Sequence, residues 1–222
     1  MTETKIYPIL KGVMDEACEE MDPVKNRTAC TDTIIALKNS LRETYKTDAP
    51  EAGLAAPQIG KLERIFVVNF KAGETNDFKS FINPMIISVK GTAMSREKCV
   101  NLGKQYIVVR YHNVAISYMT PMGKIETAKF TGSAARVIQY LTDHLNGISL
   151  KDIGLEIDDD FDLLSDEDKQ SIITQYLEGL DIKVKAAQES LKDDEFYKQA
   201  IEGLEEESTK TAELMAMDIK SK

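Results

Sequence analysis

The sequence predicts an α+β domain followed by an acidic helical extension. Between residues 65 and 130, runs of β-branched and aromatic residues alternate with polar turns, which indicates strands. Apolar residues recur at helical spacing before and after this region, which places a helix on each side of the strands in sequence. The composition then becomes acidic and helical. We therefore expect one domain over 1–153 and a C-terminal extension over 154–222.

The composition is that of an intracellular globular protein. The chain has 222 residues, of which 42% are hydrophobic and 29% charged. No apolar run approaches the roughly 18 residues of a membrane span, and the first residues lack the apolar core of a signal peptide. The three cysteines (Cys18, Cys30 and Cys99) are odd in number and follow no pairing motif, which predicts a reducing, cytoplasmic setting.

The net charge of −9 is unevenly distributed. Residues 151–222 hold 21 Asp and Glu against 9 Lys and Arg, a net charge of −12, so the remaining residues carry a net +3. An acidic extension repels phosphate, and the first domain has no concentrated basic run. We therefore expect no nucleic-acid partner.

The first half of the chain predicts one helix and two strands. Residues 24–45 place Cys30 and later apolar residues on one side of a helix, and Pro50 follows its end. Residues 65–70 are a clear strand. Residues 81–89 predict a second strand, which Pro84 breaks early.

The second half predicts more strands and a second helix. Residues 106–110 and 114–118 are expected to pair through a turn at 111–113, which would place His112 in that turn. Residues 124–130 predict a further strand. Residues 133–147 predict an amphipathic helix that stops at Gly147.

This second helix carries the first candidate for chemistry. Tyr140 and His144 are four residues apart, the spacing at which two histidines of a His-Glu-x-x-His helix hold a metal. Here Tyr140 replaces the first histidine and Leu141 replaces the glutamate, so only His144 is left as a ligand. Taken alone, the helix is better explained as ordinary core than as a metal site, because Ile138, Leu141 and Leu145 form an apolar stripe.

Three stretches together resemble the motifs of peptide deformylase. They are Gly53-Leu54-Ala55-Ala56-Pro57-Gln58-Ile59-Gly60, Glu97-Lys98-Cys99-Val100-Asn101, and the run from Gln139 through His144 to Gly147. The resemblance extends over about residues 5–150 and includes Ile82-Asn83-Pro84. It implies a peptide-deformylase-like fold, with antiparallel strands around the helix that bears the third motif.

The resemblance also implies roles for single residues. The family removes N-formyl groups from nascent proteins with a metal, Fe(II) or Zn, which one Cys and two His hold, while a Glu moves the proton. Cys99 and His144 match two of the ligands. Gln58 matches the residue that donates to the formyl oxygen, and Val100 matches the residue whose backbone N–H assists it.

The departures from the family pattern predict a lost activity. Tyr140 replaces the third ligand, and Leu141 cannot transfer a proton. Glu51 and Lys98 stand where the family has glycines and are expected to crowd the peptide groove. We therefore expect no catalytic residue, no bound metal, and remnant positions at Gln58, Val100, Cys99 and His144.

Three functions stay open at this point. The first is a pseudoenzyme with a binding, structural or assembly role, for which a bacteriophage virion or accessory protein is one setting, since phages encode deformylase-like proteins. The second is a divergent deformylase that uses Cys99, His144 and a third ligand outside the motif. The third is a peptide-binding module that keeps the Gln58 groove without cleavage.

The extension is the added part of this chain. Ser165 precedes three acidic residues suited to a first helical turn, and Ile173, Leu177 and Leu180 belong to an apolar stripe. The extension is either a solvated helix packed on its own domain or an arm that docks a partner. The partner would be a protein, either a second copy of the chain or a larger assembly, and neither nucleic acid nor membrane.

Overall fold

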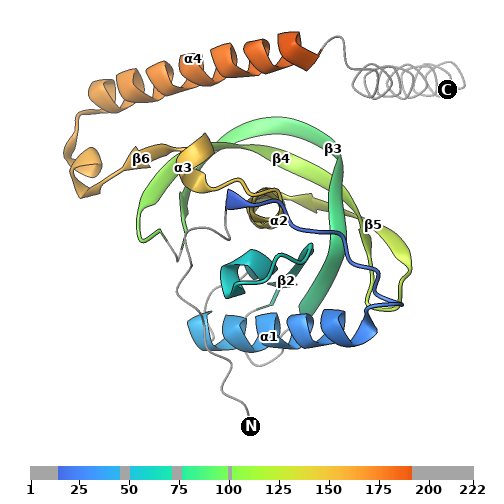
Figure 1. Ribbon diagram of the computed structural model, residues 1–222. Coiled ribbons are helices and arrows are strands. Elements are labelled where there is room, and N and C mark those ends of the chain that lie inside the picture. Colours follow the sequence, from blue (N-terminus) through green and yellow to red (C-terminus); the bar gives the residue numbers. More distant parts are fainter. Residues whose placement is uncertain (1–14, 46–50, 72–76, 100–101, 192–222) are drawn as a thin grey trace, which may run out of the picture. The chain divides into compact units, whose positions relative to one another are not determined.

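The computed structural model describes residues 15–45, 51–71, 77–99 and 102–191, and within the last helix it describes side chains only as far as Leu180. Strands follow the order β1-β2-β3-β4-β5 in one antiparallel sheet, and β6 pairs with β4 away from this path. The sheet curls around helix α2 (Figure 1). This arrangement confirms the predicted α+β class. None of the helices described is long and apolar enough to cross a membrane.

Strand β2 (Ile65–Asn69) separates two apolar layers. It pairs with β1 (Ala52–Ala55), and all of its residues are buried. Ile65 and Val67 pack in the cluster that contains α1, whereas Phe66 and Val68 pack in the cluster that contains α2. This strand is therefore buried on both faces, as its unbroken apolar sequence requires.

Helix α1 spans Arg27–Tyr45 and covers the outer layer, as predicted. Its apolar side contains Cys30, Ile34, Leu37 and Leu41, all buried. The Asp22 carboxylate accepts hydrogen bonds from the backbone N–H groups of Val24 and Lys25, which forms the turn before the helix.

Strands β3 (Phe78–Lys98) and β4 (Gln105–Met119) are much longer than the sequence predicts. Pro84 does not break β3, because it lies where the β3–β4 register shifts and where the pairing with β2 has ended. The predicted turn at 111–113 is wrong as well. His112 is an exposed residue in the middle of β4, which β3 and β5 pair on either side.

Strand β5 (Ile125–Thr131) leads directly into α2 (Gly132–Leu145), so both elements agree with the prediction. Gly132 has φ 61° at the junction, and Gly147 has φ 71° just after the helix. Left-handed backbone of this kind is open to glycine at little cost, so these two positions fix where α2 begins and ends.

The first compact unit extends further than the expected domain. It ends at Asp162 and the second begins at Leu163, whereas we expected the division at 153/154. Helix α3 (Leu150–Ile153), strand β6 (Leu155–Ile157) and the short 3₁₀ helix η3 (Asp159–Leu163) follow α2. Because β6 pairs with β4 and Phe161 is buried, residues 154–162 are held by the first unit.

The second unit contains one long helix, α4 (Asp166–Leu191). The Ser165 hydroxyl accepts a hydrogen bond from the Asp168 backbone N–H, so the predicted helix start is confirmed. The helix continues through Gly179, although glycine weakens a helix interior. The rest of the extension expected over 154–222, from residue 192 onward, lies outside the described residues.

Candidate functional site

Helix α2 holds the candidate site, and Gln139 fixes its position. The Gln139 side chain accepts a hydrogen bond from the Tyr111 backbone N–H and donates one to the Tyr111 carbonyl, both at 2.8 Å. A strand partner would make the same two bonds, so Gln139 attaches α2 to the middle of β4. The next residue, Tyr140, is thereby placed beside the motif turn.

Gln58 donates to Tyr140. It lies in the short 3₁₀ helix η2 (Ala56–Ile59), and its Oε1 accepts the Ala55 backbone N–H at 2.9 Å. That bond orients the amide so that Nε2 donates to the Tyr140 hydroxyl at 3.4 Å. The group that would polarise a formyl oxygen in the family therefore has the phenol oxygen as an acceptor.

Tyr140 also packs on His144. The two ring centroids are 4.4 Å apart with an interplanar angle of 78°, an edge-to-face contact. The i, i+4 spacing that the sequence singled out therefore brings these rings together, but as a packed aromatic pair.

Cys99 and His144 also meet, as the resemblance implied. Cys99 Sγ is 4.0 Å from His144 Nε2, and both side chains are at most 1% exposed. Among the described residues, His144 Nδ1 has no hydrogen-bond partner. A proton on Nδ1 would be a buried donor with no acceptor, so the favoured tautomer carries it on Nε2, toward the sulfur.

The surroundings keep His144 neutral. Burial, with a smaller contribution from the positive charge of Arg110, lowers the pKa of His144 to about 3. At neutral pH the pair is therefore an imidazole next to a buried cysteine side chain.

Leu141 belongs to the core. It is fully buried in the cluster between α2 and the sheet. A Cβ added to Gly53 on β1 would lie 2.5 Å from Leu141 Cδ1 and 3.2 Å from the carbonyl oxygen of Val67. Leu141 thus packs directly on the backbone of the first motif, and only a glycine at 53 leaves it room.

A buried ion-pair network, which the sequence reasoning missed, lies beside the site. Arg110 on β4 binds both Glu97 oxygens, with Nε–Oε1 at 3.0 Å and Nη2–Oε2 at 2.9 Å, and also contacts Asp143 on α2. Burial opposes the charge of Arg110, but these carboxylates outweigh it and raise its pKa above the ordinary value. The signal was available, since arginine is rare inside a β-branched strand unless it is paired.

The structure describes two of the three remaining positions that the sequence singled out. Glu51, which stands for a family glycine, is half-buried and has φ 60°, a left-handed conformation that glycine adopts far more easily. Lys98, which replaces the other glycine, is exposed. Val100 lies outside the described residues.

Comparisons with known proteins agree with this geometry. The family model described as "Polypeptide deformylase" matches residues 4–154. A peptide deformylase of Orientia tsutsugamushi (strain Ikeda) is 32% identical over 148 residues, covering 59% of this chain and 81% of its own length. One of Rickettsia typhi is 35% identical over 150 residues, covering 64% and 83%. The crystal structure of a peptide deformylase from Legionella pneumophila has the same fold, with a TM-score of 0.58 at 21% identity, covering 81% of this chain and 96% of that one.

The antiparallel sheet curls around α2, whose His144 meets Cys99 just after β3, and a solved peptide deformylase shares this scaffold. The chain belongs to the peptide deformylase family.

The residues present do not fit the metal of that family. A protein site for zinc or iron of this kind takes at least three protein ligands, and no group of three His, Cys, Asp or Glu converges in the part of the chain that the structure describes. The third position holds Tyr140, whose hydroxyl is hydrogen-bonded to Gln58. A metal on His144 Nε2 would also move the proton to Nδ1, where a ligating histidine normally has an acceptor and this one has none.

Proposed function

We propose that this protein is a deformylase-family member that does not deformylate and that acts by binding other proteins. The observation that carries the proposal is the position of Tyr140, which packs on His144 and accepts the hydrogen bond of Gln58. Tyr140 thus stands where the family has a metal ligand, and it accepts the hydrogen bond that the family's glutamine donates to the formyl oxygen of the substrate.

Leu141 also supports the proposed loss of deformylation, because it replaces the residue that moves the proton in the family. A general acid or base contributes about 100- to 10,000-fold to a hydrolytic rate, and leucine has no proton to give or take. Because Leu141 is fully buried against Gly53, another carboxylate could act from that position only by displacing this side chain.

The alternative is a divergent metal-dependent deformylase, which needs a third ligand from elsewhere. Glu97 and Asp143 are the acidic residues nearest to Cys99 and His144 in sequence, and Arg110 binds both. Drawing either carboxylate onto a metal would leave a buried arginine without its counterion. The described residues therefore favour the non-catalytic role.

The test measures activity and metal content on the same protein. Protein purified without oxygen and supplied in turn with Fe(II), Ni(II) and Zn(II) is given an N-formylmethionyl tripeptide, and free amine is measured. We expect no turnover above buffer and well under one metal per chain. Turnover that Cys99→Ser abolishes would overturn the proposal and establish the divergent enzyme.

Binding of the same tripeptide without turnover would identify the third function, a peptide-binding module. Tyr140→Phe removes the hydroxyl that accepts from Gln58 and leaves the ring in place. If the groove binds formyl peptides, this variant should bind them more tightly than the wild type. Equal, negligible binding by both proteins supports a closed groove.

We assign the binding role to the acidic extension. Its net charge of −12 and its long helix α4 lie beyond the part that the family model matches. To test this role, the chain is truncated after Asp162, because Phe161 is buried and Asp162 pairs with Arg96, so both residues are needed by the first unit. The truncated chain should stay folded and lose its association with a protein partner or a second copy. Unchanged association would show that the extension is not the docking element.

The setting that we propose is an intracellular assembly, with a phage particle as one candidate. Mass spectrometry of purified particles tests this directly. Absence of the chain from particles, with its presence in the cell lysate, would leave a cytoplasmic assembly as its place of action.

A further inference from the structure

One stretch of β3 has two exposed faces and one edge without a neighbouring strand among the described residues. Between Ser88 and Arg96 the strand pairs with β4 in an unbroken register, but its opposite edge has no strand partner among the described residues, because β2 pairs only as far as Ile82. Both faces of the stretch are exposed, with Ser95 half-buried as the exception. An open edge is a row of unpaired N–H and C=O groups, a template for another strand.

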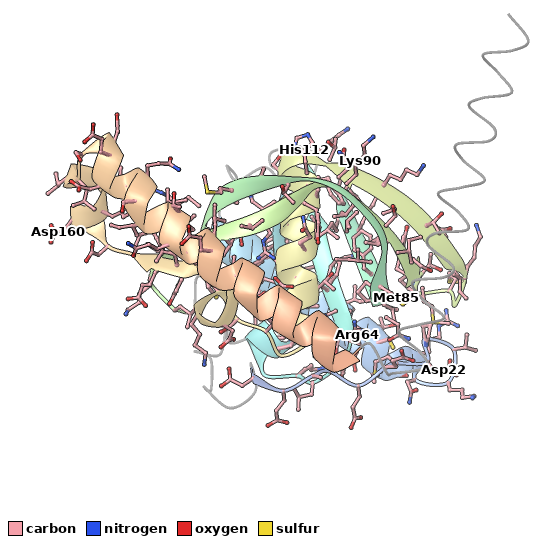
Figure 2. All side chains as sticks on the ribbon, turned by 90° about the horizontal axis from the view of Figure 1, so that it is seen from above. Asp22, Arg64, Met85, Lys90, His112 and Asp160 are labelled. Atoms are coloured by element: carbon pink, nitrogen blue, oxygen red, sulfur yellow. The ribbon has the colours of Figure 1, made fainter. Side chains whose placement is uncertain are left out.

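The side chains along this edge are apolar and cationic. Met85, Ile87, Val89 and Met94 are 59%, 41%, 41% and 51% exposed, respectively. Figure 2 shows Met85 and Lys90 along β3, with His112 of the neighbouring β4 close to Lys90. Exposed apolar side chains grouped in this way mark a binding surface more often than scattered ones do.

The same region lacks acidic residues. Residues 83–96 and 105–119 contain no Asp or Glu, although the chain has 37 of them. Lys90 makes no ion pair within the described residues, and Arg96 pairs only with the exposed Asp162 at the far end of the stretch. The edge is therefore a cationic region of an acidic protein.

We propose that the β3 edge from Ser88 to Ser95 binds an extended acidic segment of another protein by strand addition. The segment's backbone continues the sheet, its carboxylates lie on the face of Lys90 and Met94, and its alternate apolar side chains lie on the opposite face with Val89. The edge ends before Glu97, so the site is separate from the motif residues around Cys99. This binding proposal does not depend on whether the chain deformylates.

A second copy of the same strand is a poorer occupant. Pairing of two β3 edges would bring cations together with no acidic residue to offset them. Gly91 has φ 65°, and the register shifts before Ser88, so the edge is not a flat surface for self-assembly. The irregular backbone is the same for any strand added here, so the charge of the edge is what favours an acidic strand from a different protein.

The experiment uses the full chain and a labelled probe peptide, Ac-Glu-Val-Glu-Val-Glu-Val-Glu-NH₂, with binding followed by fluorescence anisotropy. We expect saturable binding that weakens with salt, and none to the same peptide with Lys in place of Glu. Lys90→Glu should weaken binding about fivefold or more, whereas Lys71→Glu, just after β2 and beside the opposite end of β3, should change it less than about twofold.

Two N-methylated probes separate strand addition from contact through side chains alone. In an added strand, alternate N–H groups face β3, so methylation of one alternate set should abolish binding and methylation of the other should not. Equal effects of the two sets would overturn strand addition, as would a lack of binding by the parent peptide. Binding of a single-stranded RNA with loss on Lys90→Glu, or a dimer of the full chain that Lys90→Glu breaks, would overturn it in favour of a different occupant. None of these outcomes bears on the tripeptide activity assay, so the two proposals fail separately.

Discussion

Tyr140→His should recreate a metal site from what remains of the old one. Cys99 Sγ and His144 Nε2 are 4.0 Å apart, which is less than the roughly 4.4 Å given by one Zn–S and one Zn–N bond end to end. One ion can therefore contact both atoms. A histidine at 140, one helical turn before His144, would add the third ligand.

The expected gain follows from linkage between binding and folding. Metal at 100 times its dissociation constant stabilises the folded state by about 2.7 kcal/mol. In a chain of this size, that corresponds to a rise in Tm of about 5–11 °C. Because His144 Nδ1 lacks an acceptor, the affinity should be about 10- to 100-fold poorer than that of a complete site, so the metal titration must extend to high concentration.

The assay is a thermal melt with and without Fe(II), Ni(II) or Zn(II). Tyr140→Phe is the matched control, since it removes the hydroxyl without adding a ligand, and neither it nor the wild type should shift by more than about 1 °C. If Tyr140→His gains no metal-dependent stability, the three side chains do not converge, and the assignment of Cys99 and His144 as remnant ligands is wrong.

Three further predictions concern stability, measured by urea unfolding. Glu51→Gly should leave the protein equally stable or up to about 1 kcal/mol more stable, because it relieves a left-handed residue (φ 60°); a loss would show that the Glu51 side chain has a structural role. Gly53→Ala should cost about 1–3 kcal/mol through its clash with Leu141, whereas Gly179→Ala, with open space around it in α4, should cost nothing. Finally, an unfolded histidine has a pKa of about 6.5 and folded His144 about 3, so the unfolded chain takes up the proton first, and stability falls as the pH drops from 6.5 toward 3. Relative to His144→Gln, the wild type should lose about 2 kcal/mol between pH 7 and pH 5, and parallel pH profiles would refute the neutral buried imidazole.

The sequence predicts the elements whose signals are local. The helix ending at Tyr45, the strand starting at Ile65 and the helix of the third motif lie within a few residues of their expected bounds. The errors arise in β3 and β4, where polar residues at 111–113 resembled a turn. Asn113 pairs with both β3 and β5, and Tyr111 pairs with β3, which overrides the weak strand preference of His112 and Asn113; no local pattern reports such pairing.

The site was predicted as a set of residues but not as an arrangement. The motifs bring Cys99 and His144 together, as the resemblance implied. Spacing alone does not reveal that Tyr140 packs on His144 and accepts from Gln58, because these contacts depend on how η2 lies against α2. The left-handed backbone of Glu51 could not be predicted either, because the sequence gives a residue type and not a dihedral angle.

The motif residues that this chain retains have structural roles that do not require catalysis. Gln58 caps its own turn through the Ala55 N–H, and Gln139 joins α2 to β4 by two bonds. Cys99 is fully buried in a cluster of its own with its apolar neighbours Tyr106, Val108 and Leu150. By contrast, the two changed positions, Tyr140 and Leu141, hold a metal ligand and a buried carboxylate in the family, and both would cost stability in a protein without a metal to pair with them. The proposed loss of the metal would therefore remove the reason to keep those two residues while leaving the structural reasons to keep the others, and this is the pattern of changes in the chain.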